Sequence, residues 1–275
     1  MRLFLLLIVA LFPLSSAAAG ERGADRRAAA KRYELRVEKE GWKGANQADL
    51  SAVFRSATSE IAVHFAGTEK FDLEPIRIRR DDSGPIVLFK RSLRGEIVMM
   101  LSSGGTYWSQ HAYQVAHEFC HILCRYKDGD KTNLWFEESL CELASIYAMR
   151  QMAITWETSP PYRNWKDYRK ALKKYADDVA GKYVLPEGKA FPAWFKENRE
   201  QLSKKPTQRA LNGVVAVQLL PIFEKTPEAW QALPYLNLGR GKEKQSFNEY
   251  LRAWHDNAPE RLRPHIVKIA EEFKL

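Results

Sequence analysis

The chain has 275 residues, 45% of them hydrophobic, and a formal net charge of +9. This length and composition are sufficient for one sizeable hydrophobic core or two small ones. The basic residues are scattered, and no nucleic-acid motif, internal repeat or low-complexity tract occurs, so neither a nucleic-acid partner nor a repeat architecture is indicated. We interpret the positive charge as a solvated surface with, at most, an unspecific attraction to a polyanionic cell envelope.

The N-terminus has the pattern of a secretory signal. Arg2 precedes an apolar run from Leu3 to Phe12, and the small residues at 17–19 fit a signal-peptidase site. We therefore expect a signal peptide over residues 1–19, a loose leader over 20–32, and a secreted or periplasmic protein. The apolar run is shorter than the about 20 residues of a spanning helix, and no second long apolar segment follows. We thus expect no transmembrane span after signal removal, with an uncleaved membrane anchor as the alternative.

A small α/β part is predicted over residues 33–108. Its first run alternates apolar and polar residues, as a strand does, and the next run places apolar residues at helical spacing. Three short β-like runs follow, separated by the turn-like sequences DDSG and SLRG. The strands are predicted at 33–41, 75–80, 85–91 and 96–102, and the helix at 46–65.

The remainder, residues 109–275, has an almost wholly helical pattern that is interrupted by prolines. We therefore expect an α+β protein in which a small N-terminal part with an antiparallel or mixed sheet precedes a mostly helical part. The two parts are expected to form a single catalytic unit. The helices are predicted near 109–126, 134–152, 162–179, 192–203, 207–224, 226–232, 246–256 and 260–273.

The sequence AHEFCH, at 116–121, matches the H-E-x-x-H spacing of many zinc peptidases. Residues four apart on a helix project side by side, so His117 and His121 can hold one ion. The surrounding helix is apolar nearly all round, which makes two unpaired imidazoles and the Glu118 carboxylate costly to bury. The alternative is a pair of histidines that are hydrogen-bonded within an ordinary core.

A zinc site needs a third protein ligand, and the next helix offers candidates. The sequence LWFEESLCELAS carries Glu137, Glu138 and Glu142 among large apolar residues, so at least part of this acidic face should be buried. Three acids on a helix more commonly form a solvated face. Glu138 and Glu142 lie one turn apart on the same face, whereas Glu137 points about 100° away from Glu138.

The two motifs together resemble those of the gluzincins, the thermolysin-like branch of the clan MA metallopeptidases. The resemblance covers roughly residues 96–150 and consists of H-E-x-x-H, 16 intervening residues and a glutamate. It implies a zincin-like fold and a zinc ion held by His117, His121 and Glu138. It also implies that Glu118 acts as the general base on a water molecule.

The same resemblance implies hydrogen-bonding partners for the two zinc-binding histidines. Glu142 is expected to hold His117, and Glu137 is expected to hold His121, which would orient both rings and set their tautomers. Ser139 stands where the family usually has glycine, a mild departure from its pattern.

Two further family features concern the substrate. The run at 96–102 is expected to be the edge strand above the cleft, where a peptide could add as a further strand, although an ordinary core strand is equally compatible. A tyrosine or histidine downstream commonly donates to the oxyanion; here the nearest positions are Arg209, Ala210 and Asn212, and Tyr162 is another candidate. The glutamate of the aminopeptidase branch is missing, so aminopeptidase activity is not inferred.

Three cysteines in an oxidising compartment allow at most one intramolecular bridge. If a bridge forms, we expect it between Cys120 and Cys141, which leaves Cys124 free; three buried thiols are the alternative. The other histidines are interpreted as structural or surface residues: His64, His111, His255 and His265.

The sequence therefore predicts a secreted or periplasmic zinc-dependent hydrolase with endopeptidase-like action on a peptide or protein substrate. The alternative is a catalytically weak or inactive zincin-fold module that binds cell-envelope or wall material. Retention of Glu118 favours the hydrolase, because a purely structural zinc site has no use for a base. The missing downstream tyrosine favours the binding module.

Overall fold

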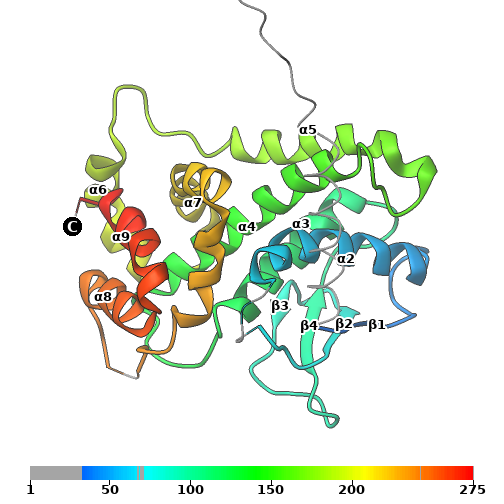
Figure 1. The fold of residues 1–275 in the computed structure, drawn as a ribbon, viewed down its shortest axis with the longest axis horizontal. Helices are drawn as coiled ribbons and strands as arrows, with labels where there is room; N and C mark the ends of the chain where they lie inside the picture. Colours follow the sequence, from blue (N-terminus) through cyan, green and yellow to red (C-terminus); the bar gives the residue numbers. More distant parts are fainter. Residues whose placement is uncertain (1–32, 67, 69–70, 242, 275) are drawn as a thin grey trace, which may run out of the picture.

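The computed structural model describes residues 33–66, 68, 71–241 and 243–274, and its fold is α+β (Figure 1). The signal peptide and leader predicted at 1–19 and 20–32 lie outside the described residues. A small sheet with its covering helix lies at one end of the molecule, and helices make up the rest.

The sheet has four strands in the order β1-β2-β4-β3. Strands β1 (Leu35–Val37), β2 (Ile76–Arg80) and β4 (Ile97–Leu101) run parallel, whereas β3 (Ile86–Val87) is antiparallel to β4. The sheet is therefore mixed, although β1 and β3 are shorter than the runs from which they were predicted.

Helix α2 (Gln47–Ala62) makes the crossover between the parallel strands β1 and β2, a connection that needs a long segment. The side chain of Asn46 caps its start by accepting the Ala48 N–H at 2.7 Å. Its buried stripe includes Leu50, Phe54 and other residues at helical spacing, and this stripe packs the helix against the two that carry the H-E-x-x-H and glutamate motifs.

The prediction that 96–102 forms the edge strand is wrong. Strand β4 pairs with β2 on one side and β3 on the other, and all five of its residues are buried. The sequence IVMML is apolar on both faces, which suits an internal strand. The edge beside α3 is β3, which reaches β4 through a turn closed by the Ser92 N–H to Glu96 O bond.

Helices α3 (Trp108–Leu123) and α4 (Leu134–Thr155) form the centre of the molecule. Helix α4 contacts α2, α3, α5, α6 and α7, and 16 of its residues are buried. A helix that is apolar on every side is stable only when other elements cover it all round. The two motif-bearing helices are thus held on all sides by their neighbours.

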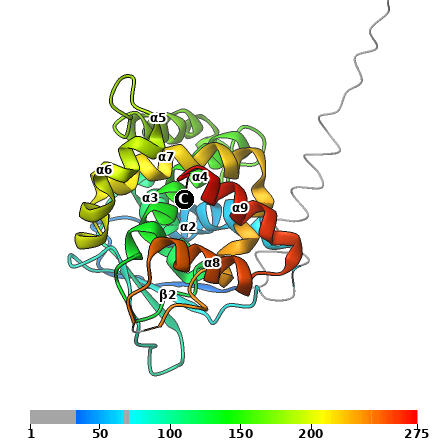
Figure 2. The ribbon, with the colours of Figure 1, turned by 90° about the vertical axis from the view of Figure 1, so that its left-hand side faces the viewer.

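The C-terminal helices enclose one end and one side of α4 (Figure 2). Aromatic rings on α6, α8 and the segment after α9 pack around Trp135 near the start of α4, with Trp135 and Phe247 centroids 4.7 Å apart. Two predicted helices are divided, each having a 3-10 turn before its α-helix, and the one near 226–232 is entirely 3-10. The elements are η2 (Arg163–Tyr168), α5 (Arg169–Ala180), α6 (Phe191–Lys204), α7 (Arg209–Lys225), η3 (Pro227–Tyr235), α8 (Phe247–Asn257), η4 (Glu260–Leu262) and α9 (Arg263–Glu271).

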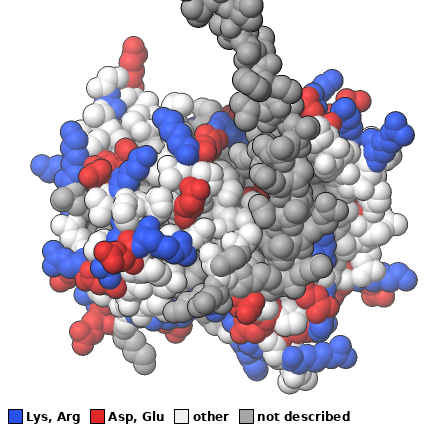
Figure 3. Space-filling model, viewed as in Figure 1, with Lys and Arg blue, Asp and Glu red and all other residues white. Residues whose placement is uncertain are grey.

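Basic and acidic side chains are interspersed over the described residues of the face in Figure 3. Some exposed ion pairs join residues of one helix, such as Lys174 with Asp178 on α5 at 2.6 Å. Within the described ranges, no helix combines the length and apolar character that crossing a bilayer requires.

Candidate metal centre

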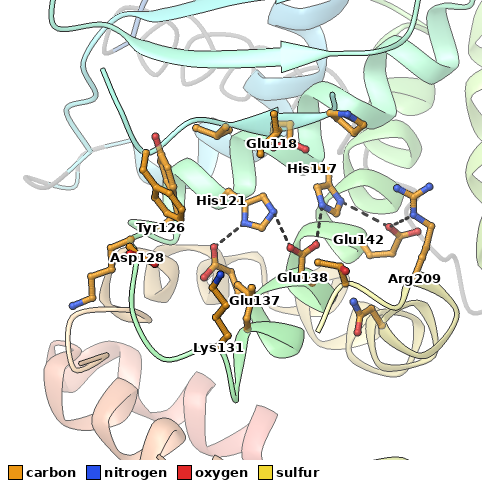
Figure 4. A pocket seen from close by; sticks show the side chains of 18 of the residues that line it. His117, Glu118, His121, Tyr126, Asp128, Lys131, Glu137, Glu138, Glu142 and Arg209 are labelled. Carbon is orange, nitrogen blue, oxygen red and sulfur yellow. Dashed lines mark hydrogen bonds and ion pairs between the residues drawn. The ribbon is translucent and has the colours of Figure 1, made fainter. Parts of the chain in front are cut away.

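Helix α3 presents His117 and His121 side by side at one wall of a cavity of about 390 Å³ (Figure 4). The two ring centroids are 5.2 Å apart, as expected for neighbours one helical turn apart. Each side chain keeps a little over a tenth of its surface exposed, so both rings reach the cavity from an otherwise buried helix. The volume lies within the usual range of small-molecule and peptide sites.

Glu138 on α4 faces both imidazoles. Its Oε2 lies 3.4 Å from His117 Nε2, and its Oε1 lies 3.7 Å from His121 Nε2. A charge-assisted hydrogen bond would be about 2.7–2.9 Å long. Two ligand atoms that share a tetrahedral ion at about 2.1 Å are separated by about 3.4 Å. The spacing of these three side chains therefore suits atoms arranged around a divalent ion better than it suits direct hydrogen bonds.

The electrostatics of the two groups also suit a cation. Burial alone would raise the pKa of Glu138, but the neighbouring imidazoles outweigh burial and hold the pKa below its ordinary value. Burial alone would lower the pKa of His121, but the hydrogen bond to Glu137 and the surrounding carboxylates raise the pKa to about 10. The carboxylates thus favour positive charge at this position, and a bound metal ion would replace the proton.

Glu137 holds the far nitrogen of His121. Its Oε1 is 2.7 Å from His121 Nδ1, and its Oε2 accepts a hydrogen bond from Asn237 Nδ2 at 2.8 Å. Arg240 Nη1 lies 3.4 Å from the same oxygen, and Tyr250 in turn donates to Asn237 Oδ1 at 2.9 Å. This buried network fixes the ring so that Nε2 points into the cavity. The sequence offered no periodic signal for Asn237 or Arg240.

Glu142 lies beside the far nitrogen of His117 but does not form a hydrogen bond with it. The Nδ1 to Oε2 distance is 3.8 Å, and Nδ1 is a buried nitrogen without a hydrogen-bond partner among the described residues. The Glu142 carboxylate instead accepts a hydrogen bond from Tyr113, and the Tyr183 side chain is close enough for Glu142 to raise the pKa of Tyr183. Tyr113 lies four residues before His117 on α3, a spacing from which its proximity could have been inferred.

Glu118 points from α3 toward the edge strand and is only 3% exposed. Burial raises the pKa of its carboxyl above the usual range, against the opposing effect of the nearby imidazoles. It lines the same cavity as the two histidines but lies outside the contacts that Glu138 makes. A carboxylate with a raised pKa in this position suits proton transfer.

A cysteine is an alternative candidate for the third ligand at this site. His117, His121 and Cys141 each place one potential ligand atom within 4.8 Å of the other two. Cys141 comes three residues after Glu138 on α4, and its thiol is fully buried. The local sequence pattern gave no sign that Cys141 lies close to the histidines, and Cys141 was expected only as a bridge partner or a buried thiol.

All three cysteines are free thiols in the structure, so the bridge expected between Cys120 and Cys141 is not formed in it. Cys120 is in hydrogen-bonding contact with both Cys124 and Cys141, and burial raises the pKa of all three thiols. The thiols therefore pack as small apolar groups with weak mutual hydrogen bonds.

The cavity runs along the edge of the sheet between β3 and the first turn of α7. Pro85, Ile86, Val87 and Phe89 supply its apolar wall, and Tyr126 adds a ring whose hydroxyl donates to Leu88 O at 2.8 Å. No local sequence pattern had indicated that Tyr126 lines the cavity. The polar lining residues beyond the motifs include Lys127, Asp128, Lys131, Thr207, Arg209, Asn212 and Arg240.

Of the positions nearest to the family's downstream tyrosine, Arg209 and Asn212 line the cavity, whereas Ala210 and the candidate donor Tyr162 do not contribute to the described lining. Arg209 Nε lies 4.0 Å from Glu142 Oε2. The side chain of Asn212 is buried and donates to Pro206 O at 2.7 Å. The first turn of α7 therefore brings a permanent cation to the cavity, and no tyrosine.

The other histidines lie outside the cavity lining. His111 is fully buried and satisfied at both nitrogens, by Ser103 Oγ at 2.8 Å and Gly105 O at 2.9 Å. His64 contacts Tyr147, and His255 contacts Asp256. Like His265, which is half-buried, they do not line the described cavity.

Comparisons of this chain with protein-family models, with curated proteins and with solved structures found no match. Any function must therefore be argued from the site itself.

Proposed function

We propose that this protein is a zinc-dependent hydrolase that cleaves peptide bonds, with a gluzincin-type site and a zincin-like fold, and that it acts as a secreted or periplasmic protein. The observation that carries the proposal is the placement of Glu138 opposite both His117 Nε2 and His121 Nε2, at 3.4 and 3.7 Å. Glu118 beside this group supplies the base that a hydrolase requires and a purely structural metal site does not.

The proposed ligand set is His117, His121 and Glu138. Cys141 is the competing third ligand, but its thiol is fully buried and its pKa is raised by burial, whereas Glu138 reaches the cavity with its pKa lowered. A ligand must bind in its deprotonated form, so the carboxylate is favoured over the thiol at neutral pH. Two nitrogens and one carboxylate oxygen are a common zinc set that leaves a position open.

A zinc ion held by His117, His121 and Glu138 would supply Lewis acidity for a water molecule and for the scissile carbonyl. Glu118 takes the proton of that water and passes it to the leaving amine, so the peptide bond is exchanged for a carboxylic acid and an amine. Glu137 orients the imidazole of His121 through its 2.7 Å contact, and Glu142 lies 3.8 Å from the far nitrogen of His117.

A second candidate function is a weakly active or inactive zincin-fold module that binds cell-envelope or wall material. It is favoured by one observation, the absence of a tyrosine on the described first turn of α7. The interspersed charges of Figure 3 do not single out a polyanion-binding surface on that face.

The test compares wild-type protein with Glu118→Gln. We expect each to bind about one zinc ion per chain by elemental analysis, and only the wild type to cleave an unfolded reduced protein, because Gln preserves the shape of the side chain but cannot accept the proton. Absence of zinc in chelator-free protein would overturn the metal assignment. Full activity of Glu118→Gln would show that another group is the base, and an inactive wild type with bound zinc would favour the binding module.

A further inference from the structure

A smaller side cavity of about 100 Å³ opens beside the candidate metal centre. It shares Pro85, His117 and Arg209 with the main cavity, so a group bound in it would lie next to the reacting bond. The rings of Tyr113 and Tyr175 form part of its wall and meet edge to face with centroids 6.1 Å apart. A volume of this order admits several non-hydrogen atoms rather than one water molecule.

The polar side chains of this side cavity are either engaged in hydrogen bonds or available for a ligand, and the exposed amide of Gln110 is available both to donate and to accept. Gln114 is occupied, because its Oε1 accepts from the Ser102 and Ser103 N–H groups at 3.0 Å and its amide donates to Ser102 Oγ. Tyr113 is also occupied, since its hydroxyl donates to Glu142.

In contrast to Gln114 and Tyr113, the side chains of Arg209 and Tyr175 still have donors available for a ligand. Arg209 comes no closer to Glu142 than 4.0 Å, and that approach uses Nε, so its terminal nitrogens make no hydrogen bond within the described part of the chain. The Tyr175 hydroxyl likewise makes no hydrogen bond to the described residues. Glu142 accepts a hydrogen bond from Tyr113 and approaches Arg209 only at Nε, and this leaves the terminal nitrogens of the guanidinium for a ligand.

We propose that this side cavity binds an acidic side chain of the substrate, with Arg209 as the specificity-determining residue and Tyr175 as a second donor. The inference rests on the proposed peptidase function. A planar guanidinium with free terminal N–H groups matches a carboxylate in two parallel hydrogen bonds, and it repels a lysine or arginine side chain. An uncharged apolar side chain would make none of these hydrogen bonds, and the Arg209 side chain, which is 62% exposed, would stay hydrated instead. The substrate class is therefore a peptide with aspartate or glutamate next to the cleaved bond.

The experiment measures binding, and the Glu118→Gln protein loaded with zinc is used so that peptides are not consumed. Two labelled peptide pools with random flanking positions carry Glu or Gln at one fixed central position, and fluorescence anisotropy reports binding. We expect the Glu pool to bind about threefold to fivefold tighter, because water weakens an ion pair with a guanidinium on a side chain that is 62% exposed. Arg209→Gln in the same background should remove this preference and leave the affinity for the Gln pool unchanged.

Lys205→Gln is the matched control, because it removes the same charge from an exposed position just before α7 and outside both cavities. It should keep the preference. Equal binding of the two pools, no measurable binding of either, or a preference that survives Arg209→Gln would overturn the inference. Cleavage of an unfolded protein by the wild type, without any preference for acidic residues, would leave the peptidase proposal standing while this inference failed. A preference for the Glu pool without any cleavage would do the reverse.

Discussion

Glu137 and Glu138 are adjacent in sequence, but their surroundings predict that one matters more for the stability of the metal-free protein and the other more for zinc affinity. Glu137 is 1% exposed and is the acid beside the buried Arg240, with further contacts to His121 and Asn237. Removing one member of a buried ion pair typically costs about 3–5 kcal/mol. Because Gln keeps an acceptor oxygen for part of this network, we expect Glu137→Gln to lower the free energy of unfolding of the metal-free protein by about 3 kcal/mol.

Glu138 should behave in the opposite way. The imidazole nitrogen nearest to its carboxylate is His117 Nε2 at 3.4 Å, and its side chain is 17% exposed. Without metal it makes little contribution, so we expect Glu138→Gln to change the free energy of unfolding by less than about 1 kcal/mol. With zinc the order reverses: loss of a ligand should weaken binding more than the about 10- to 100-fold typical of losing a group that only orients a ligand.

The assay has two arms on each variant. Urea unfolding of the chelator-treated protein gives the stability, and zinc titration against a chromophoric chelator gives the affinity. The assignment would be refuted if Glu137→Gln bound zinc more weakly than Glu138→Gln, because Glu137 would then be the ligand. Equal affinity of wild type and Glu138→Gln would instead point to Cys141 as the third ligand.

Three further outcomes are expected. Gly213→Ala should destabilise the protein by about 1–3 kcal/mol in thermal or urea unfolding, although Ala normally favours a helix, because the added Cβ would come within 2.5 Å of the Tyr183 ring; an increase in stability would contradict the packing. Burial lowers the pKa of His111 below its usual 6.5, so the unfolded chain binds the proton more tightly than the folded chain does. The free energy of unfolding should therefore be highest above about pH 6.5 and should fall as the pH drops from there toward the lowered pKa. The fall should be smaller in His111→Gln, and identical pH profiles of the two proteins would count against this. Buried Cys120 and Cys141 should react with a thiol reagent only after denaturant is added, and mass mapping that found them bridged would contradict the free thiols.

Local patterns predicted much of the helical framework. The spacing of apolar residues predicted α2, α3, α4, α6 and α7 to within a few residues, because a helix follows from covalent geometry and from which side chains can share a face. The mixed sheet was also predicted, but its edge was assigned to the wrong strand. An apolar run such as IVMML fits any covered strand, and only pairing partners distant in sequence decide whether it is internal.

In the candidate site, too, local spacing predicts some features and the packing of the whole chain decides the others. The i,i+4 spacing of His117 and His121 ensures that they project together wherever the helix lies, and the sequence of α4 restricts the third ligand to a few acids. Which atoms face which depends on the packing of α3 against α4, and the support of His121 comes from Asn237, which is 100 positions away from Glu137. The donors left free beside Arg209 are likewise set by what its neighbours already bind. Contacts of this kind join segments that share no local spacing rule, so packing of the whole chain decides them and no pattern within one helix can.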